Sequence, residues 1–401
     1  MHPILFEIPL PRAAVPLGVS LLLLAAIGAV VAMLGRHGRQ RDVTAMGVSV
    51  FVVALIAAIG LGGREAILGP LPIYGFGVML CAGLFAGWFL CLANAARDGL
   101  SRDASAQTYV AAAVCGIAGA RALYVVTNYG AFASFGEALA VRSGGLVFYG
   151  GVLGGFAGAW FYAKRRRLDF LAWTDAAAPS LALGSMLGRM GCYFAGCDYG
   201  RLLGPGASRF LVKLGTFPRW PDAVAGPGAG SPAWVDQVLY RGLPFDRATA
   251  MPVHPTELYE SVTSGVVLLL LILLRPHKQF RGQVFLAFVA LYGAMRFALE
   301  MVRDDPERGA YGPLIARGAV AAIGFALLAA AFAAGPARSL TRQRSRAAAY
   351  ALALASPLVA YVTMAKERDP MALSTSQWIA IGSSIAAAFV WRRLARIAAL
   401  G

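Results

Sequence analysis

Long apolar runs alternate with short polar breaks along the whole chain. About eleven of these runs approach the length of roughly 20 residues that a helix needs to cross a bilayer. Segments that alternate apolar and polar residues are absent, so the runs are expected to be helical. The pattern therefore predicts an all-α, polytopic integral membrane helical bundle. The predicted spans are residues 13–34, 45–62, 73–94, 108–128, 144–164, 178–199, 257–274, 283–302, 313–335, 347–364 and 376–391.

Composition assigns the chain to the same class. Hydrophobic residues make up 58% of it and charged residues 14%, which leaves too few polar residues to cover a water-soluble fold of 401 residues. The 47 glycines fit helices that pack closely in lipid. Near the N-terminus, Glu7 and the length of the run 13–34 favour a first membrane span over a cleavable signal peptide.

The net charge of +16 lies mainly in alternate breaks, which is typical of the cytoplasmic loops of membrane proteins. Nucleic-acid binding is therefore not expected. With eleven spans, this distribution predicts an outer N-terminus and a cytoplasmic C-terminus. The basic residues on the predicted inner side are Arg36, Arg39, Arg41, Arg97, Arg102, Lys164, Arg165, Arg166, Arg167, Arg275, Lys278, Arg281, Arg338, Arg342, Arg344, Arg346, Arg392, Arg393 and Arg396.

The break at residues 200–255 is the one sizeable polar segment in the sequence. It is rich in Gly and Pro, and it carries Trp220 and Trp234. We expect an irregular cap on the outer surface with both indoles near the lipid headgroups, and no separately folded domain.

Arg189 lies near the middle of an apolar run, where a guanidinium group is costly unless it has a polar partner. Gly188, Gly191 and Gly196 surround it and allow another helix or a ligand to approach closely. One interpretation is a helix-packing seam whose Arg extends outward to the interface. The other is a cation held in a membrane cavity to bind an anion, for which a lipid headgroup is the obvious candidate.

Two further polar clusters open predicted spans. Tyr149 lies between two glycine pairs, which fits either a packing seam or a hydroxyl facing an open site. The segment His254–Glu260 begins with a His-Pro pair and continues with Glu257, Tyr259 and Glu260. It fits an ordinary helix start or a set of partners for a buried arginine.

The third cluster is Arg296, Glu300 and Arg303, which share one helical face. Glu300 is expected to pair with Arg296, and Arg303 is expected near the outer surface. A purely structural ion pair is one interpretation. Together with Arg189, however, the cluster gives two buried guanidinium groups, a combination that favours phosphate binding.

Taken in order, these motifs resemble the prolipoprotein diacylglyceryl transferases of bacterial inner membranes. The matching motifs are 72–75, 119–121, 144–151, 174–175, 187–200, 254–260, 296/300/303 and 373–377. The resemblance implies transfer of the diacylglyceryl group of phosphatidylglycerol to the cysteine thiol of a lipobox in a prolipoprotein signal peptide. The products are a thioether and glycerol phosphate, in a protein modification that belongs to lipoprotein biosynthesis. No cofactor, metal or nucleotide is implied.

The resemblance also implies site residues. Arg189 would bind the phosphate, Arg296 would neutralise charge that develops as it leaves, and Tyr149 would orient or relay a proton. The substrate-binding residues would be Arg189, Tyr74, Arg121, Gly145, Asp175, His254, Glu257, Tyr259, Glu260, Glu300 and Arg303.

The family resemblance predicts four parts of the chain. Residues 68–306, with six spans and the outer loop, and residues 371–401, with the last span and a cytoplasmic tail, form a transferase-like core of about seven helices. Residues 1–67 are an N-terminal two-span addition, and residues 307–370 are a two-span insertion.

Several positions depart from the family signature. Cys192, Ala195 and Cys197 stand where the signature has two Asn and a Glu, so two amides and a carboxylate are missing from the expected site. Pro72 and Ile73 replace the usual His and Trp. These changes leave two alternatives to the transferase: a lipid-binding paralogue without turnover, and a membrane thiol-redox protein that uses Cys192 and Cys197. The two cysteines also fit a packing role.

Overall fold

The computed structural model forms two compact units, Ile4–Tyr74 and Gly75–Gly401 with Met1–Pro3. It describes residues 3–8, 13–16, 22, 25–30, 32–33, 36, 65–68, 71–132, 145–220, 230–305, 308–340, 342–365 and 369–400. The predicted span 45–62 and residue 144 lie outside these ranges.

The first unit contains two antiparallel strand pairs. Strand β1 (Ile4–Ile8) pairs with β4 (Leu71–Tyr74), and β2 (Ala13–Pro16) pairs with β3 (Glu65–Leu68). The first predicted span was expected to be helical from residue 13. The structure instead begins it with β2, because this segment pairs with residues 65–68, and residues 25–30 are helical.

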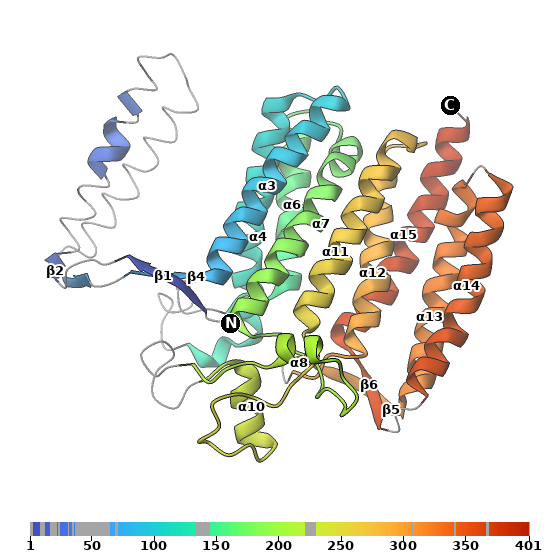
Figure 1. Cartoon of the computed structure of the whole chain (residues 1–401). Helices are drawn as coiled ribbons and strands as arrows, with labels where there is room; N and C mark the ends of the chain where they lie inside the picture. The colour runs from blue at the N-terminus through green and yellow to red at the C-terminus, as the bar shows by residue number, and fades with distance from the viewer. Residues whose placement is uncertain are drawn as a thin grey trace. The chain divides into compact units, whose positions relative to one another are not determined.

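Among the residues that the structure describes in the second unit, nine long helices lie side by side (Figure 1). They coincide with the last nine of the predicted spans, which confirms an all-α bundle for this part of the chain. The helices are α3 (Gly75–Arg97), α4 (Arg102–Thr127), α6 (Phe148–Arg165), α7 (Phe170–Ala195), α11 (Thr256–Leu274), α12 (Gln283–Glu300), α13 (Arg317–Ala334), α14 (Gln343–Met364) and α15 (Thr375–Leu400).

Six stretches of the described chain are long and apolar enough to cross a membrane, and they contain α3, α4, α11, α12, α13 and α14. This supports a multi-pass membrane protein. Helices α6, α7 and α15 are of similar length but are not among these stretches. For α7 the reason is its position: it packs against α3, α11 and α12, so protein rather than lipid covers much of its surface.

Helix α7 begins at Phe170, well before the predicted residue 178. The Asp169 side chain accepts a hydrogen bond from Ala172 N and caps the helix, and residues 172–180 are buried. A helix start that is covered by protein does not need the continuous apolar run on which the prediction relied.

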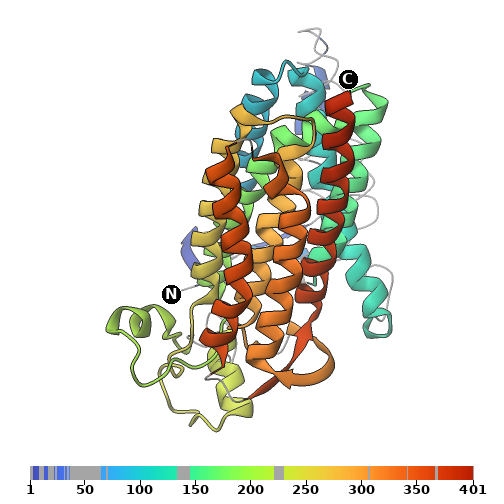
Figure 2. The same cartoon turned by 90° about the vertical axis from the view of Figure 1, so that its right-hand side faces the viewer.

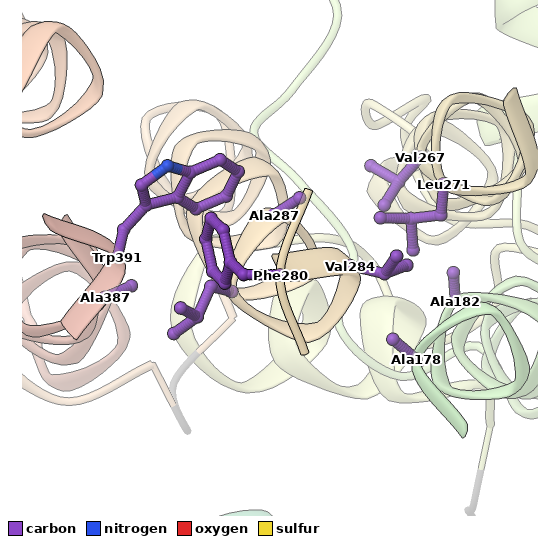
Figure 3. Close-up of a cluster of buried hydrophobic side chains, with 10 residues drawn as sticks. Ala178, Ala182, Val267, Leu271, Phe280, Val284, Ala287, Ala387 and Trp391 are labelled. Carbon is purple, nitrogen blue, oxygen red and sulfur yellow. The ribbon is translucent and has the colours of Figure 1, made fainter. Parts of the chain in front are cut away.

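Two kinds of contact hold the bundle together. Along the α4–α6 seam, a Cβ at Gly119 would lie 2.4 Å from the Gly150 carbonyl oxygen, so only glycine allows this approach. Elsewhere, larger apolar side chains interlock between α7, α11, α12 and α15 (Figure 3). That cluster contains Ala178, Ala182, Val267, Leu271, Phe280, Val284, Leu286, Ala287, Ala387 and Trp391.

The described residues 200–220 and 230–255 form a cap at one end of the bundle, where α8 (Arg209–Gly215) and α10 (Pro232–Tyr240) lie (Figure 1). It has its own small apolar core, formed by Tyr199, Phe217, Ala233, Trp234, Leu243, Ala250 and Val253. Apart from these two short helices and isolated bridges, the described part of the cap is irregular, which agrees with the expected irregular cap. Trp234 is only 1% exposed and its indole donates to the Arg247 carbonyl oxygen at 2.9 Å, so it is a core residue of the cap and not a headgroup anchor.

The predicted insertion is the helical pair α13 and α14, which pack against each other (Figure 2). Strand β5 (Ala310–Ala316) precedes the pair, strand β6 (Pro370–Ser374) follows it, and the two strands are antiparallel partners. The two ends of the segment are thus adjacent, so the chain returns to α15 close to where it left α12. The remaining short elements are 3₁₀ helices at η1 (Tyr129–Ala131), η3 (Arg275–His277) and η5 (Pro336–Ser339).

Candidate active site

The Arg189 side chain points into the protein. It lies near the C-terminal end of α7, its side chain is 17% exposed, and it pairs with Asp198 at 2.5 Å and with Glu260 at 3.1 Å. These partners come from the turn after α7 and from α11. An arginine that extends outward to the interface is therefore excluded, and the guanidinium group is held in a polar site between elements.

Asp198 reaches this site because α7 ends just before it. Gly196 caps the helix with φ of +67°, and Asp198 itself has φ of +64°, a conformation that Asp tolerates better than most residues. Its carboxylate pairs with both Arg189 and Arg303. The sequence had suggested that a site carboxylate was lost at Cys197. The structure corrects this, because Asp198 supplies a carboxylate from the neighbouring position.

Glu260 joins the two arginines expected to bind phosphate. One carboxylate oxygen lies 3.1 Å from Arg189 Nε and 2.8 Å from Arg296 Nη1. The Tyr292 hydroxyl donates to the other oxygen at 3.2 Å. The single carboxylate thereby ties α7, α11 and α12 together and holds both guanidinium groups next to each other.

Tyr149 is connected to Arg296 through a serine. The Tyr149 hydroxyl donates to Ser376 Oγ at 2.8 Å, and Arg296 Nη2 donates to the same oxygen at 3.4 Å. Arg296 also pairs with Glu300 at 2.5 Å, as expected. Tyr149 therefore belongs both to the glycine seam between α4 and α6 and to the hydrogen-bonded chain that reaches Arg296.

Arg303, which was expected near the outer surface, is buried beneath the cap. It is 9% exposed and pairs with Asp198, Asp305 and Glu300. The cap covers it, because Gly200 forms a backbone bridge with Arg303 at the start of the cap. Arg308, which the sequence analysis missed, pairs with Glu300 at 3.2 Å.

We call these groups the arginine–carboxylate network. Its members are Arg189, Arg296, Arg303, Arg308, Asp198, Glu260, Glu300 and Asp305. The four positive and four negative charges balance, so the guanidinium groups are held in place before any anion arrives. Such pre-organised cations can bind a phosphate through several hydrogen bonds.

The two signature cysteines lie beside the network. Both are free thiols, and their sulfur atoms and a carboxylate oxygen of Asp198 lie within 4.8 Å of one another. Arg189 Nη1 is 3.8 Å from Cys192 Sγ. Two sulfurs and an oxygen are possible ligands for a soft metal ion. However, binding one would require Asp198 to give up its arginine partners, so the donor set fits a metal poorly.

The other site residues predicted on the outer side are not members of the network. His254 and Tyr259 contact each other at 3.2 Å where the cap meets α11. Arg121 donates to the Gly145 carbonyl oxygen at 3.1 Å, and its guanidinium group lies over the Tyr124 ring. Tyr74 ends β4 in the first unit and is exposed.

Asp175 is placed far from the network. It lies fourteen residues before Arg189 on the same helix, which corresponds to about 21 Å. The buried carboxylate accepts hydrogen bonds from the backbone N–H groups of Gly282, Val284 and Phe285 and so caps α12. Lys278 lies 3.8 Å from it. The structure therefore does not bring Asp175 together with the other predicted site residues.

Comparison with known proteins identifies the family. The family model of the prolipoprotein diacylglyceryl transferases matches residues 64–392, which is most of the chain. This chain belongs to that family. The match contains every member of the arginine–carboxylate network and, of the long helices described in the second unit, all but the last eight residues of α15, so the site lies within the stretch that the family model matches.

Individual relatives agree with this assignment. A phosphatidylglycerol–prolipoprotein diacylglyceryl transferase of Clostridium perfringens is 30% identical over 240 residues, 59% of this chain and 81% of the relative. The protein of the same name in Geobacillus kaustophilus is 32% identical over 239 residues, with 59% and 79% covered. The one in Bacillus cereus is 30% identical over 253 residues, with 63% and 84% covered.

Five residues in or beside the network were not predicted as site residues from the sequence: Asp198, Asp305, Arg308, Tyr292 and Ser376. Asp198 and Tyr292 could have been noticed, because each is a polar residue within or directly after an apolar run. Asp305 and Arg308 follow α12 in a polar break that looks like an ordinary loop, and only folding brings them onto Glu300 and Arg303.

Proposed function

We propose that this protein transfers the diacylglyceryl group of phosphatidylglycerol to the thiol of a lipobox cysteine in a prolipoprotein. Membership of the transferase family and the names of its relatives support both substrates. The structural observation that carries the proposal is the position of Arg189 and Arg296 on the two sides of Glu260. A phosphate that displaces Glu260 would meet both guanidinium groups at once.

The chemistry requires a group that holds the phosphate while its bond to the glyceryl carbon breaks. In the proposed step, the acceptor sulfur forms a bond to that carbon, and the carbon–oxygen bond to phosphate breaks. The electron pair leaves with the phosphate oxygen, so the released glycerol phosphate gains negative charge. Arg189 grips the phosphate throughout, and Arg296 stabilises the charge that develops on the departing oxygen.

The other predicted residues have supporting roles in this proposal. Tyr149 orients Arg296 through Ser376, and Glu300 holds both Arg296 and Arg303. His254 and Tyr259 lie at the edge of the cap, where an acceptor peptide would approach from outside the membrane. We retain Arg121, Gly145 and Tyr74 as candidate substrate contacts, and we infer that Asp175 stabilises the fold.

We further propose a place in the bacterial inner membrane with a periplasmic N-terminus and a cytoplasmic C-terminus. Two observations favour this orientation. The cap and the network lie at one end of the bundle, whereas Arg97, Lys164 and Arg165 end their helices at the other end. Basic residues favour the cytoplasmic side. A periplasmic site is also where an exported prolipoprotein would meet the enzyme.

The domain proposal follows from the same comparison. Residues 68–306 and 371–401 form the catalytic core, residues 1–67 are a two-span addition, and residues 307–370 are a two-span insertion. The β5–β6 pairing supports the assignment of residues 307–370 as an insertion, because it keeps the ends of this segment adjacent and lets α15 pack against α12.

The test is a transfer assay with the purified protein in phosphatidylglycerol vesicles and a synthetic lipobox peptide. Mass spectrometry should find the peptide heavier by one diacylglyceryl group, together with an equal amount of glycerol phosphate. The same peptide with serine in place of the acceptor cysteine is the control and should stay unmodified. Lack of the adduct with the cysteine peptide, in protein that still unfolds cooperatively, would contradict the proposal.

A further inference from the structure

Glu257 is a buried acid without a hydrogen-bond partner. It lies in the first turn of α11, the residue is 1% exposed, and neither carboxylate oxygen accepts a hydrogen bond from another residue. Among the residues that the structure describes, no other Asp or Glu combines burial with two unpartnered oxygens. Because burying such a group without a partner is costly, its position calls for an explanation.

Its surroundings place it at the edge of the arginine–carboxylate network. Glu260, which binds Arg189 and Arg296, is three residues later on the same face of α11. Thr256, the preceding residue, donates its hydroxyl to the Asp198 carbonyl oxygen. The titratable groups that act electrostatically on Glu257, or on which it acts, are Arg189, Cys192, Tyr193, Cys197, Asp198 and Tyr259.

The four carboxylates of the network are all engaged by arginines, and each would have to give up an ion pair to accept a proton. Glu257 can accept a proton without breaking an ion pair or a hydrogen bond to another residue. The reaction needs such an acceptor, because a free cysteine thiol is mostly protonated at neutral pH and the thiolate is the nucleophile. The Tyr149 hydroxyl is instead engaged with Ser376.

We propose that Glu257 is the base that removes the proton from the acceptor thiol, a role that rests on the transferase function proposed above. The thiol proton passes to a Glu257 oxygen as the sulfur lone pair forms the bond to the glyceryl carbon. The electron pair of the breaking carbon–oxygen bond leaves with the phosphate at Arg189 and Arg296. Glu257 then returns its proton to the departing phosphate or to water, which restores the resting site.

The test compares a cysteine peptide with a selenocysteine peptide of the same sequence. A selenol is ionised at neutral pH, so it needs no base. Glu257→Gln, which keeps the size and removes the basicity, should lower kcat with the cysteine peptide by about 100-fold or more, the usual range for a general base. With the selenocysteine peptide the variant should recover most of the wild-type rate. Recovery also demonstrates that the variant is folded.

Two control variants separate the possible outcomes. Asp103→Asn changes an exposed acid at the start of α4 and should leave both rates unchanged. Glu257→Asp keeps a carboxylate and should retain more activity toward the cysteine peptide than Glu257→Gln. An equal loss with both peptides, or wild-type turnover of the cysteine peptide by Glu257→Gln, would overturn the role. If wild-type protein forms no adduct at all, the proposed function itself fails.

Discussion

Asp198 shows how a single residue sets the geometry of this site. Its carboxylate contacts Arg189 from α7 and Arg303 from the region after α12, and it can do so only because the chain turns at Gly196. Gly200 keeps the turn close to the cap, since a Cβ there would lie 2.8 Å from His254 Cβ. The orientation of Arg189 therefore depends on the turn as well as on its own helix.

This dependence makes Asp198→Asn a test at the level of one residue. The variant keeps the shape of the side chain but removes the charge that holds Arg189, and it leaves the network with one excess positive charge. We expect kcat to fall by about 10- to 100-fold, since misoriented transition-state groups cost rate. KM for phosphatidylglycerol should not rise, because the cations that bind it remain.

Steady-state kinetics in mixed vesicles would measure both constants. Asp246→Asn, a change at an exposed acid of the cap, is the matched control and should behave as wild type. A raised KM with unchanged kcat would show that Asp198 contributes to lipid binding and not to the placement of Arg189.

At the level of the elements, the end of the bundle opposite the cap is stabilised by cross-links between helix ends. Asp175 of α7 caps α12, and Arg275 donates to the Asp175 carbonyl oxygen and pairs with Asp98 at 3.1 Å. Lys278 also pairs with Asp98, at 2.8 Å. These contacts fix the relative positions of α3, α7, α11 and α12, the helices that carry the site at their other ends.

We expect Asp175→Ala to lower the free energy of unfolding by about 2–3 kcal/mol, because three backbone N–H groups lose a charged acceptor. At a temperature where the variant is folded, its transfer rate should stay near that of wild type, since Asp175 lies far from Arg189. Thermal unfolding in detergent and the transfer assay would measure the two effects.

Asp169→Ala provides a matched comparison, because Asp169 also caps a helix but is partly exposed. Its loss should cost about 1 kcal/mol. Equal stability losses for the two variants, or an inactive but fully folded Asp175→Ala protein, would contradict a structural role for Asp175.

At the scale of the whole molecule, the sequence was sufficient to predict the helical bundle and part of the site. The apolar runs predicted the nine long helices that the structure describes in the second unit, because a bilayer imposes length and composition on each span. Arg189, Glu260, Arg296 and Glu300 could also be identified, since charged groups within such runs are rare. The structure places these four residues in one network.

Other features could not be predicted because they depend on contacts between distant segments. The role of Asp175 requires residues 282–285 to reach it, and the core of the cap requires α10 to fold back over Phe217. The early start of α7 reflects burial by neighbouring helices. Asp198 enters the site only because the chain turns after α7 ends. A helical pattern in the sequence does not reveal such a turn.

The central claim is that Arg189 grips the phosphate of the lipid donor. The most direct measurement is the amount of diacylglyceryl peptide formed in phosphatidylglycerol vesicles by wild type, Arg189→Ala, Arg189→Lys and Arg102→Ala, the last being an exposed arginine at the opposite end of the bundle. We expect Arg189→Ala to lose about 100-fold or more of the rate and Arg189→Lys to retain only part of it. Arg102→Ala should match wild type. Folded Arg189→Ala protein that transfers at the wild-type rate would contradict the account.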